Sequence, residues 1–419
     1  MPEPDVAERI RQYNQGRDPE RLQHKYDAMA QSAFAFFRGT CHLFADAWQD
    51  SALKRAPRAW ICGDLHFENF GAYKGDNRLE YFDLNDFDEA LLAPCTVDVT
   101  RFLASLLVGA RSIHLNPSQA RALCAATLHT YARALGDGKA RWIERDTASG
   151  MVKDLLRGLQ TRTRKQLLKK RTVRDGRQRR LRVDGEHALP ASSAARRTVT
   201  QLMGRLAADA ARPEFWAVLD VGRRIAGTGS LGVERYVVLV EGKGSPDKNC
   251  LIDLKAALPS SLQAHFHTRQ PAWRTEAERV VTVQRRAQAI APALLRTVKM
   301  GPRWFTLREL QPTEDRLQLE LWDGKPRRLE AVIETMAELT AWAHLRGSGR
   351  QGAESPDAFI EFGGDPEWQP AVLEYAEAIS RQCEQQWREF RDAFAGGFFA
   401  AQLAGRTGRM ASARVRAKG

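Results

Sequence analysis

The sequence predicts an α+β fold in which two lobes share a cleft. Helical periodicity dominates the early and late parts of the 419-residue chain, whereas the middle alternates strand-like runs with turn-forming segments. A strongly basic stretch separates the first helical part from the β-rich part. We therefore divide the chain into a helical lobe, a basic insert, a β-rich lobe, a helical completion of the first lobe and a basic tail: residues 20–150, 151–195, 196–325, 326–400 and 401–419.

The first lobe combines amphipathic helices with a small sheet that carries a loop. Apolar residues recur near helical spacing over residues 21–48, and residues 94–110 and 119–135 have helix-forming, apolar-faced sequences. Two short apolar runs, residues 59–63 and 79–82, enclose the polar, turn-rich segment DLHFENFGAYKGDNR. This pattern predicts a strand, a loop and a second strand.

The β-rich lobe is predicted from four apolar or alternating runs that are separated by turn-forming residues, at positions 216–225, 235–240, 250–254 and 303–310. One helix is expected within this lobe, at 276–290. The last third returns to amphipathic helix at 329–344 and 371–398. The tail has almost no apolar residue to bury, so we expect it to be disordered.

The positive charge of the chain is concentrated in the basic insert. The chain has a formal net charge of +13, and the segment Lys153–Arg182 contains thirteen Lys or Arg residues against two Asp. This segment has no aromatic residue for base stacking, so we do not expect a nucleic-acid partner. A solvated helix with a mobile loop, which attracts anionic substrates at long range without belonging to the catalytic machinery, is the favoured interpretation.

Cysteine spacing and apolar runs constrain the compartment. No two of the six cysteines form a C-x-x-C pair, and no run of eighteen apolar residues occurs. Reduced thiols and the absence of a membrane span or signal peptide are therefore expected, which favours a cytoplasmic protein.

Two loops of the first lobe carry the sharpest chemical signal. Asp64 and Asn69 follow a short apolar strand five residues apart, which is the spacing of a phosphotransferase catalytic loop. In such a loop the Asp accepts the proton of a hydroxyl group and the Asn binds a magnesium ion. A further carboxylate must complete the magnesium site, and Asp83, Asp86 and Asp88 are the candidates on the next acidic segment.

The β-rich lobe contributes a glycine-rich segment, GTGSLG at residues 227–232, and Lys255 on the next hairpin. A strand-like run, not a helix, follows the glycines, which favours a hairpin over ATP phosphates rather than a Rossmann turn. The expected phosphate-binding residues are Gly227, Gly229, Ser230, Gly232 and Lys255. Such a lysine commonly pairs with a helical glutamate, and Glu276 and Glu278 are both candidates. Residues 303–310, followed by Gln311 and Pro312, are expected to run into an adenine-binding hinge.

These motifs carry a family resemblance. GDLHFEN is similar to the GDLHPGN loop of aminoglycoside and choline phosphotransferases, and DFDEALLAPCTVD resembles their metal-binding segment. This register favours Asp86 as the metal ligand, with Asp83 second, and gives Asp98 a structural role. Cys62 and Glu68 depart from the pattern of those enzymes. The motifs from FFRGT at residue 36 to Lys255 resemble, in their order, the bacterial domain-of-unknown-function family 2252, which is grouped with kinase-like proteins.

The order of the motifs is unusual. In ordinary kinases the glycine-rich loop and its lysine precede the catalytic loop, whereas here they follow it by about 160 residues. The resemblance therefore implies a two-lobed, circularly permuted kinase-like fold.

The expected function is an ATP- and Mg²⁺-dependent phosphotransferase that acts on a hydroxyl group of a small molecule or a protein, with Asp64 as the catalytic residue. Whether the acceptor is anionic, and what oligomeric state the protein has, stays open. Two alternatives are nucleotidyl transfer, in which ATP binds reversed and AMP is transferred, and a non-catalytic ATP-binding pseudokinase or sensor.

Overall fold

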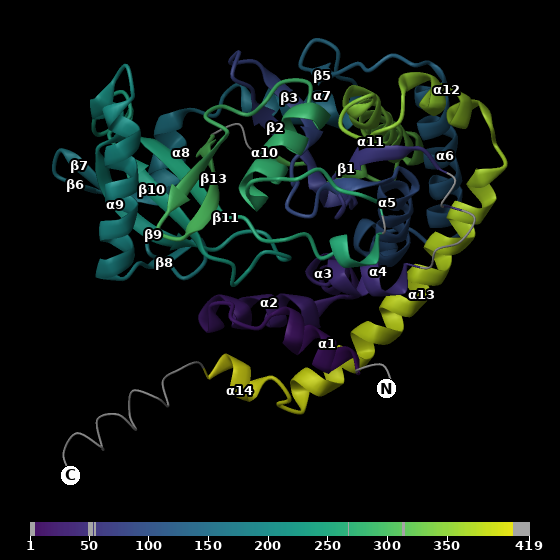
Figure 1. Cartoon of the computed structure of the whole chain (residues 1–419), viewed down its shortest axis with the longest axis horizontal. Coiled ribbons are helices and arrows are strands. Elements are labelled where there is room, and N and C mark those ends of the chain that lie inside the picture. Colours follow the sequence, from purple (N-terminus) through teal and green to yellow (C-terminus); the bar gives the residue numbers. More distant parts are fainter. Residues whose placement is uncertain (1–4, 49–52, 54–55, 267, 312–314, 405–419) are drawn as a thin grey trace.

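The computed structural model describes residues 5–48, 53, 56–266, 268–311 and 315–404. As the sequence predicts, the fold is α+β, and its sheets are antiparallel. The largest sheet has six strands. Figure 1 shows this sheet at one end of the molecule, with most of the helices gathered at the other end. The expected adenine-binding turn at Pro312 and most of the tail, residues 405–419, lie outside the described residues.

Helices from both ends of the chain build one large hydrophobic core. The early ones are α1 (Val6–Tyr13), α2 (Pro19–Gln31), α3 (Ala33–Gly39), α4 (Cys41–Ala47), α5 (Thr96–Gly109) and α6 (Pro117–Gly136). The late ones are α11 (Pro326–Gly347), α12 (Pro356–Gly364), α13 (Trp368–Ala395) and α14 (Ala400–Leu403). Nearly every residue of α5 is buried, because α3, α6 and α13 pack around it. The late helices thus complete the first lobe, as the periodicity predicts.

Two small sheets carry the loops of the first lobe. Strand β1 (Arg58–Ile61) pairs with β4 (Leu91–Pro94). In the other sheet β2 (Phe70–Lys74) pairs with β3 (Glu80–Leu84). Strand β14 (Asp315–Arg316) pairs with the free side of β2, and β5 (Ile143–Glu144) pairs with the free side of β3. The sequence predicted a loop where β2 lies. That prediction was wrong for residues 70–74, because a strand buried on both sides lacks the alternation that marks a half-buried one.

The six-stranded sheet has the order β12-β13-β11-β10-β9-β8. Its strands are β8 (Ala188–Pro190), β9 (Val218–Arg224), β10 (Arg235–Val240), β11 (Cys250–Ala256), β12 (Arg296–Met300) and β13 (Arg303–Leu310). Helix α9 (Ser193–Ala208), which the sequence analysis did not predict, packs Val199, Leu202 and Met203 against one face and builds a second core. The opposite face is turned toward the rest of the molecule.

The basic insert is folded, contrary to the expected mobile loop. It consists of helices α7 (Gly150–Leu159) and α8 (Arg164–Arg171) and the hairpin of β6 (Thr172–Asp175) with β7 (Gln178–Leu181). The apolar side of α7 enters the first core, whereas Leu168 of α8 and Leu181 of β7 pack on Leu239 and Leu251 of the sheet. Sparse apolar residues at the right spacing therefore order a segment whose average composition is strongly polar.

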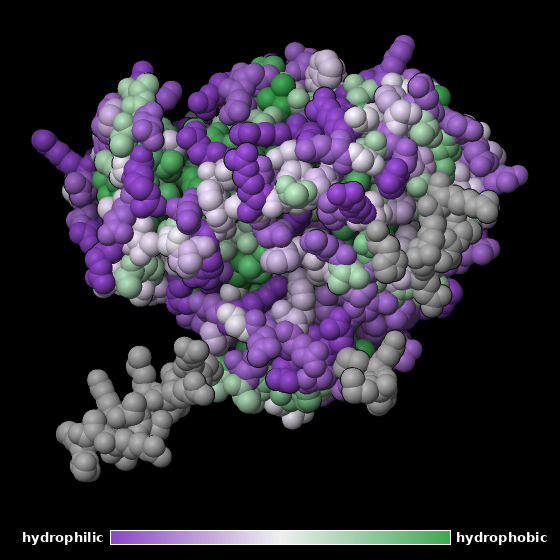
Figure 2. Space-filling model, viewed as in Figure 1, coloured by the Kyte–Doolittle hydropathy of each residue, from purple (hydrophilic) through white to green (hydrophobic). Residues whose placement is uncertain are grey.

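Helix α10 (Glu276–Ala287) lies between the two lobes and packs against β12 and β13 on one side and β1 and α11 on the other. Short 3₁₀ turns complete the described elements, at Phe67–Asn69, Ala110–Ile113, Pro213–Trp216, Gln263–His265 and Leu319–Trp322. The molecular face in Figure 2 is largely hydrophilic, with hydrophobic residues in small separate patches. Across the described ranges, no helix combines the length and the apolar character that crossing a membrane requires.

Candidate active site

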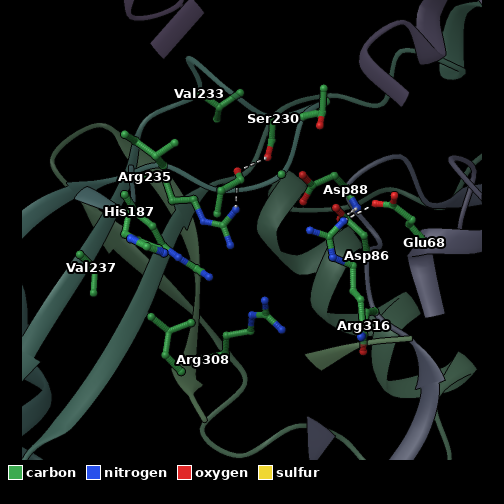
Figure 3. Close-up of a pocket in the computed structure, with 18 of the residues that line it drawn as sticks. Glu68, Asp86, Asp88, His187, Ser230, Val233, Arg235, Val237, Arg308 and Arg316 are labelled. Carbon is green, nitrogen blue, oxygen red and sulfur yellow. Dashed lines mark hydrogen bonds and ion pairs between the residues drawn. The ribbon is translucent and has the colours of Figure 1, made fainter. Parts of the chain in front are cut away.

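A cleft of about 1140 Å³ lies between the two lobes and gathers most of the residues singled out in the sequence. One wall carries Asp64, Asn69, Asp86 and Asp88 from the loops of the first lobe, and the other wall is the inner face of the six-stranded sheet. Figure 3 shows Arg235 on the sheet side and Asp86, Asp88 and Glu68 across the cleft. Segments about 160 residues apart in the chain thus meet at one place.

The loop that carries Asp64 is anchored from below by Asp98 of α5. The backbone N–H groups of Cys62 and Gly63 each donate a hydrogen bond of 2.9 Å to the Asp98 carboxylate. His344 Nε2 lies 3.3 Å from the same carboxylate, and Tyr131 bonds the other ring nitrogen of His344. Asp98 therefore has the structural role that the sequence predicted. The loop geometry is fixed by buried groups.

Gly63 allows the tight turn before Asp64. Its φ of +85° lies in the left-handed region, and a Cβ atom at this position would come 2.3 Å from the Glu89 carbonyl oxygen. The Asp64 loop and the acidic loop, residues 85–89, are thereby held in direct contact.

Asp64 lines the cleft and is held by a buried arginine. Arg101 Nε donates a hydrogen bond of 2.7 Å to Asp64 Oδ1, and the same guanidinium bonds the Phe37 carbonyl oxygen. Burial raises the pKa of Asp64 to about 6 although Arg101 opposes the shift, with Glu89 and Asp86 adding to the increase. A carboxylate with this pKa is suited to accept a proton near neutral pH.

Asn69 joins the two loops of the acidic wall. Its side-chain nitrogen donates hydrogen bonds of 3.3 Å to the backbone oxygens of Asp64 and Asp86. Asp86 is half-exposed to the cleft, and Lys255 Nζ lies 4.0 Å from its Oδ1 atom. Although burial acts in the opposite direction, Lys255 lowers the pKa of Asp86.

Asp83 does not belong to this wall. It is 2% exposed and bonds the backbone N–H of Leu84 and of Ala289, and Arg346 lies 3.3 Å from its Oδ2 atom. The prediction of Asp83 as a second metal ligand is therefore not supported by its position. Asp88, which the sequence analysis weighed as a third candidate, lines the cleft instead.

The glycine loop, residues 226–232, connects β9 to β10 and arches over Asp64. Gly227 and Gly232 have φ values of +73° and +85°. A Cβ atom on Gly229 would lie 3.8 Å from Asp64 Oδ2 and 3.1 Å from the Arg38 carbonyl oxygen, so only a glycine permits this approach without displacement. A strand follows the loop, as expected for a hairpin and not for a Rossmann turn.

Two N-terminal residues that the sequence analysis did not identify hold the glycine loop. Arg17 Nη1 donates a hydrogen bond of 2.7 Å to the Gly229 carbonyl oxygen, and Lys25 Nζ donates one of 3.2 Å to the same atom. Burial lowers the pKa of Lys25 well below its usual range. No local pattern marks these residues, because their partners lie more than 200 residues away.

Lys255 on β11 does not pair with a helical glutamate. It forms an ion pair with Asp88, whereas Glu276 pairs with Arg279 and Glu278 accepts a hydrogen bond from the Arg274 backbone. The expected Lys–Glu pair was therefore wrong for both candidates. Within the described chain, neither glutamate lines the cleft.

Arg279 explains why α10 lies where a pairing glutamate was expected. Its guanidinium is buried and donates hydrogen bonds to the carbonyl oxygens of Asp88 (2.9 Å) and Leu258 (2.8 Å). Helix α10 therefore holds the backbone of the acidic loop through the Arg279 side chain. The Asp88 side chain is left to act as the anionic partner of Lys255.

The insert also forms part of the cleft. Arg162, Lys170, Arg171 and Arg182 all line it, which contradicts the expectation of a charged segment that acts only at long range. Arg164 of α8 forms a salt bridge of 2.7 Å with Glu309 of β13, and Arg162 in the turn before α8 forms one of 2.6 Å with Asp315 of β14. These pairs fasten the insert to both sheets.

Fold and site together define an α+β protein whose charged loops converge in a cleft between two hydrophobic cores. Residues 17–393 match the model of a family described as an uncharacterized protein conserved in bacteria, DUF2252. The chain belongs to this family, as its motifs predicted. No curated protein and no solved structure matches it.

Proposed function

We propose that the protein is an ATP- and Mg²⁺-dependent phosphotransferase that acts on a hydroxyl group, with a circularly permuted kinase-like fold. The observation that carries the proposal is the convergence of Asp64, Asn69 and Asp86 with the glycine loop in one cleft, where the buried Lys255 reaches Asp86 and Asp88 from behind the wall. These are the groups that phosphoryl transfer to a hydroxyl requires: a proton acceptor, hard oxygen ligands and phosphate-binding donors.

The arrangement of the sheet supports the kinase-like assignment. The glycine loop joins β9 to β10, Lys255 lies on the next strand, and α10 follows before β12 and β13. A glycine-rich loop, a lysine on the third strand and a helix after that strand are the parts that protein kinases use. The acidic loops come earlier in this chain, so convergence in space, not order in the sequence, is the relevant similarity.

The acidic wall fits a magnesium ion. Asp86 and Asp88 face one lysine, which leaves one carboxylate in excess to bind a cation. The side-chain oxygen of Asn69 is engaged by neither of the hydrogen bonds that its nitrogen donates, and it is a hard ligand of the kind that Mg²⁺ prefers. Bound there, the ion would neutralise charge on the phosphates during transfer.

The residues of the chain then divide the work. The oxygen of the acceptor hydroxyl forms a bond to the γ-phosphorus, and Asp64 accepts the proton of that hydroxyl. The bond between the γ-phosphorus and the β–γ bridging oxygen breaks, and ADP is released. Lys255 and the backbone N–H groups of the glycine loop bind the phosphates of ATP. Arg101 orients Asp64 from behind and does not contact the acceptor.

Transfer of label tests the proposal. The protein is incubated with γ-labelled or, in parallel, α-labelled ATP, with Mg²⁺ and bacterial metabolite and protein extracts. We expect γ-label in an acceptor with the wild type and none with Asp64→Asn. Movement of the α-label instead would identify nucleotidyl transfer. ATP binding without movement of either label would favour the non-catalytic sensor.

A further inference from the structure

The tip of the glycine loop lies over the carboxylate of Asp64. Arg101 binds the Oδ1 atom of this carboxylate, so Oδ2 is the atom left for a substrate hydroxyl. A Cβ atom on Gly229 would come 3.8 Å from Asp64 Oδ2 and 3.1 Å from the Arg38 carbonyl oxygen. The backbone of the loop tip is therefore close to the atom that the proposed reaction needs.

The space under this tip does not admit a substrate hydroxyl. A hydroxyl oxygen that donates to a carboxylate lies about 2.7 Å from it, and it must keep about 3.5 Å from the carbon atoms of the loop. These two separations do not fit together between Asp64 Oδ2 and Gly229. A phosphate group beside the hydroxyl needs more space again. In Figure 3, Ser230 of the loop lies above Asp86 and Asp88 in the view. The position of the loop in the structure is therefore a closed one.

Hydrogen bonds from the N-terminal helices keep the loop in this position. Arg17 Nη1 donates to the carbonyl oxygens of Gly229 (2.7 Å) and Leu231 (3.1 Å). The Asp18 backbone N–H donates to the Gly232 carbonyl oxygen (2.9 Å). Three carbonyl oxygens near the tip are thus bound by residues from the connection between α1 and α2.

Lys25 favours the closed position because it is a buried cation. Its side chain is 0% exposed, and its Nζ atom donates to Asn14 Oδ1 (3.0 Å) and to the Gly229 carbonyl oxygen (3.2 Å). Opening of the loop removes one of these acceptors, and a buried cation that loses a hydrogen bond is costly. The closed position is therefore the more stable one in the ligand-free protein. We call Arg17, Asp18 and Lys25 the N-terminal clamp.

The clamp is anchored to the sheet, whereas the loop has glycines near both of its ends. Asp18 and Glu20 form salt bridges of 2.6 Å and 2.5 Å with Arg223 of β9. Gly227 and Gly232 have positive φ values, and glycine changes its backbone conformation at low cost. The tip of the loop can therefore move about these two positions while α1 and α2 stay docked.

We propose that the N-terminal clamp is a gate: it holds the glycine loop closed over Asp64 in the ligand-free protein, and the loop opens to admit the substrates. The identity of these substrates rests on the proposed function, whereas the closed position of the loop does not. Because the γ-phosphate of ATP must lie beside the hydroxyl on Asp64, MgATP binds the open form. Its apparent Kd is then the intrinsic Kd divided by the fraction of molecules in which the loop is open. Weakening the clamp therefore increases the affinity for MgATP.

Two measurements on one variant test the gate. Arg17→Met removes the hydrogen bonds that the guanidinium donates to the loop and keeps an unbranched stem, which lies against Gly232. The first measurement, on ligand-free protein, is the rate at which thermolysin cuts before Leu231, a buried residue of the loop. Such cleavage tracks the population of the open form. The second is a calorimetric titration with MgATP.

We expect Arg17→Met to be cut before Leu231 about tenfold faster than the wild type and to bind MgATP more tightly by a similar factor, since the lost charge-assisted hydrogen bonds favour the closed form. The matched control is Arg11→Met, which removes the same charge from α1, where Arg11 pairs with Glu8 (2.6 Å). It should behave as the wild type does in both measurements. Neither arginine is buried, so the melting temperatures of both variants should stay close to that of the wild type.

The two measurements separate a gate from a merely supporting contact. Faster cleavage of Arg17→Met with unchanged or weaker binding of MgATP would overturn the gate, because the closed loop would then not exclude the nucleotide. Unchanged cleavage would show that Arg17 does not hold the loop, which also overturns it.

Failure of the gate and failure of the proposed function give different results. If no protein binds MgATP and neither label of ATP moves, the proposed function fails, and faster cleavage of Arg17→Met still supports the clamp. If the wild type transfers label but cleavage is the same in Arg17→Met, the clamp alone is rejected.

Discussion

At the scale of single residues, two nearby carboxylates have different surroundings and so different expected roles. Asp86 is half-exposed in the cleft beside Lys255, whereas Asp83 is buried against Arg346. We predict that Asp86→Asn abolishes Mg²⁺-dependent binding of ATP and leaves the melting temperature nearly unchanged. Asp83→Asn should retain binding but lower stability, because it leaves the Arg346 guanidinium without its charge partner. Nucleotide titration and thermal melting measure both effects, and the opposite pattern would reassign the metal ligand.

Lys255 offers a second contrast. It faces Asp86 and Asp88 at the cleft, whereas Lys243 and Lys248 lie in the turn between β10 and β11. Lys255→Met should lower kcat/KM by about a hundredfold or more, since it removes a charged donor from the phosphates in a site of low dielectric constant. Lys243→Met and Lys248→Met are the controls. Similar small losses in all three variants would remove the assignment of the phosphate-binding lysine.

The raised pKa of Asp64 predicts a pH dependence. Asp64 accepts a proton only as a carboxylate, and burial raises its pKa to about 6, so the rate of transfer should fall as the pH drops below about 6. Arg101 opposes this shift, so Arg101→Gln should move the acid limb to higher pH. The acid limb is measured from profiles of kcat against pH for the wild type and for Arg101→Gln. A wild-type limb near pH 4 would exclude Asp64 as the proton acceptor.

At the scale of elements, the insert shows how a few apolar residues order a charged segment. Leu168 is fully buried between α8 and the sheet, in contact with the cluster that contains Leu239 and Leu251. Leu168→Ala should lower the free energy of unfolding by about 2–5 kcal/mol. Val173→Ala, at an exposed site on β6, is the control and should change it little. Chemical denaturation gives both values, and equal small effects would show that the insert does not pack on the sheet.

The N-terminal helices act on another element, the glycine loop. Arg17 and Lys25 both donate to the Gly229 carbonyl oxygen, so the loop is held at its centre by residues from outside its own sheet. The position of the glycine loop is therefore coupled to the docking of α1 and α2.

At the scale of the whole molecule, two cores are joined around the cleft. Helix α7 belongs to the first core, α8 packs on the sheet, and α10 lies between β13 and β1. Because ATP and Mg²⁺ would contact both lobes, their binding should stabilise the whole fold by about 2.7 kcal/mol at a hundred times Kd. Thermal melting should show the increase with MgATP in the wild type and none in Asp86→Asn. An unchanged melting temperature in the wild type would argue against a nucleotide site.

The sequence by itself determined most of the elements and the family. Strands at Arg235–Val240 and Arg303–Leu310 lie where the pattern predicted them, because residues a few positions apart set periodicity. The motifs around Asp64 and Gly227 identified the two sides of the cleft for the same reason: each is a local turn with its own residue requirements.

Only the tertiary structure decided which charged groups meet. The partner of Lys255 is Asp88 and not Glu276, Asp83 does not line the cleft, and the insert forms part of it. Ion pairs and buried hydrogen bonds join residues that lie far apart in the chain, and several carboxylates of similar local context compete for each cation. Burial and distance choose among them, and neither quantity is encoded in the spacing of neighbouring residues.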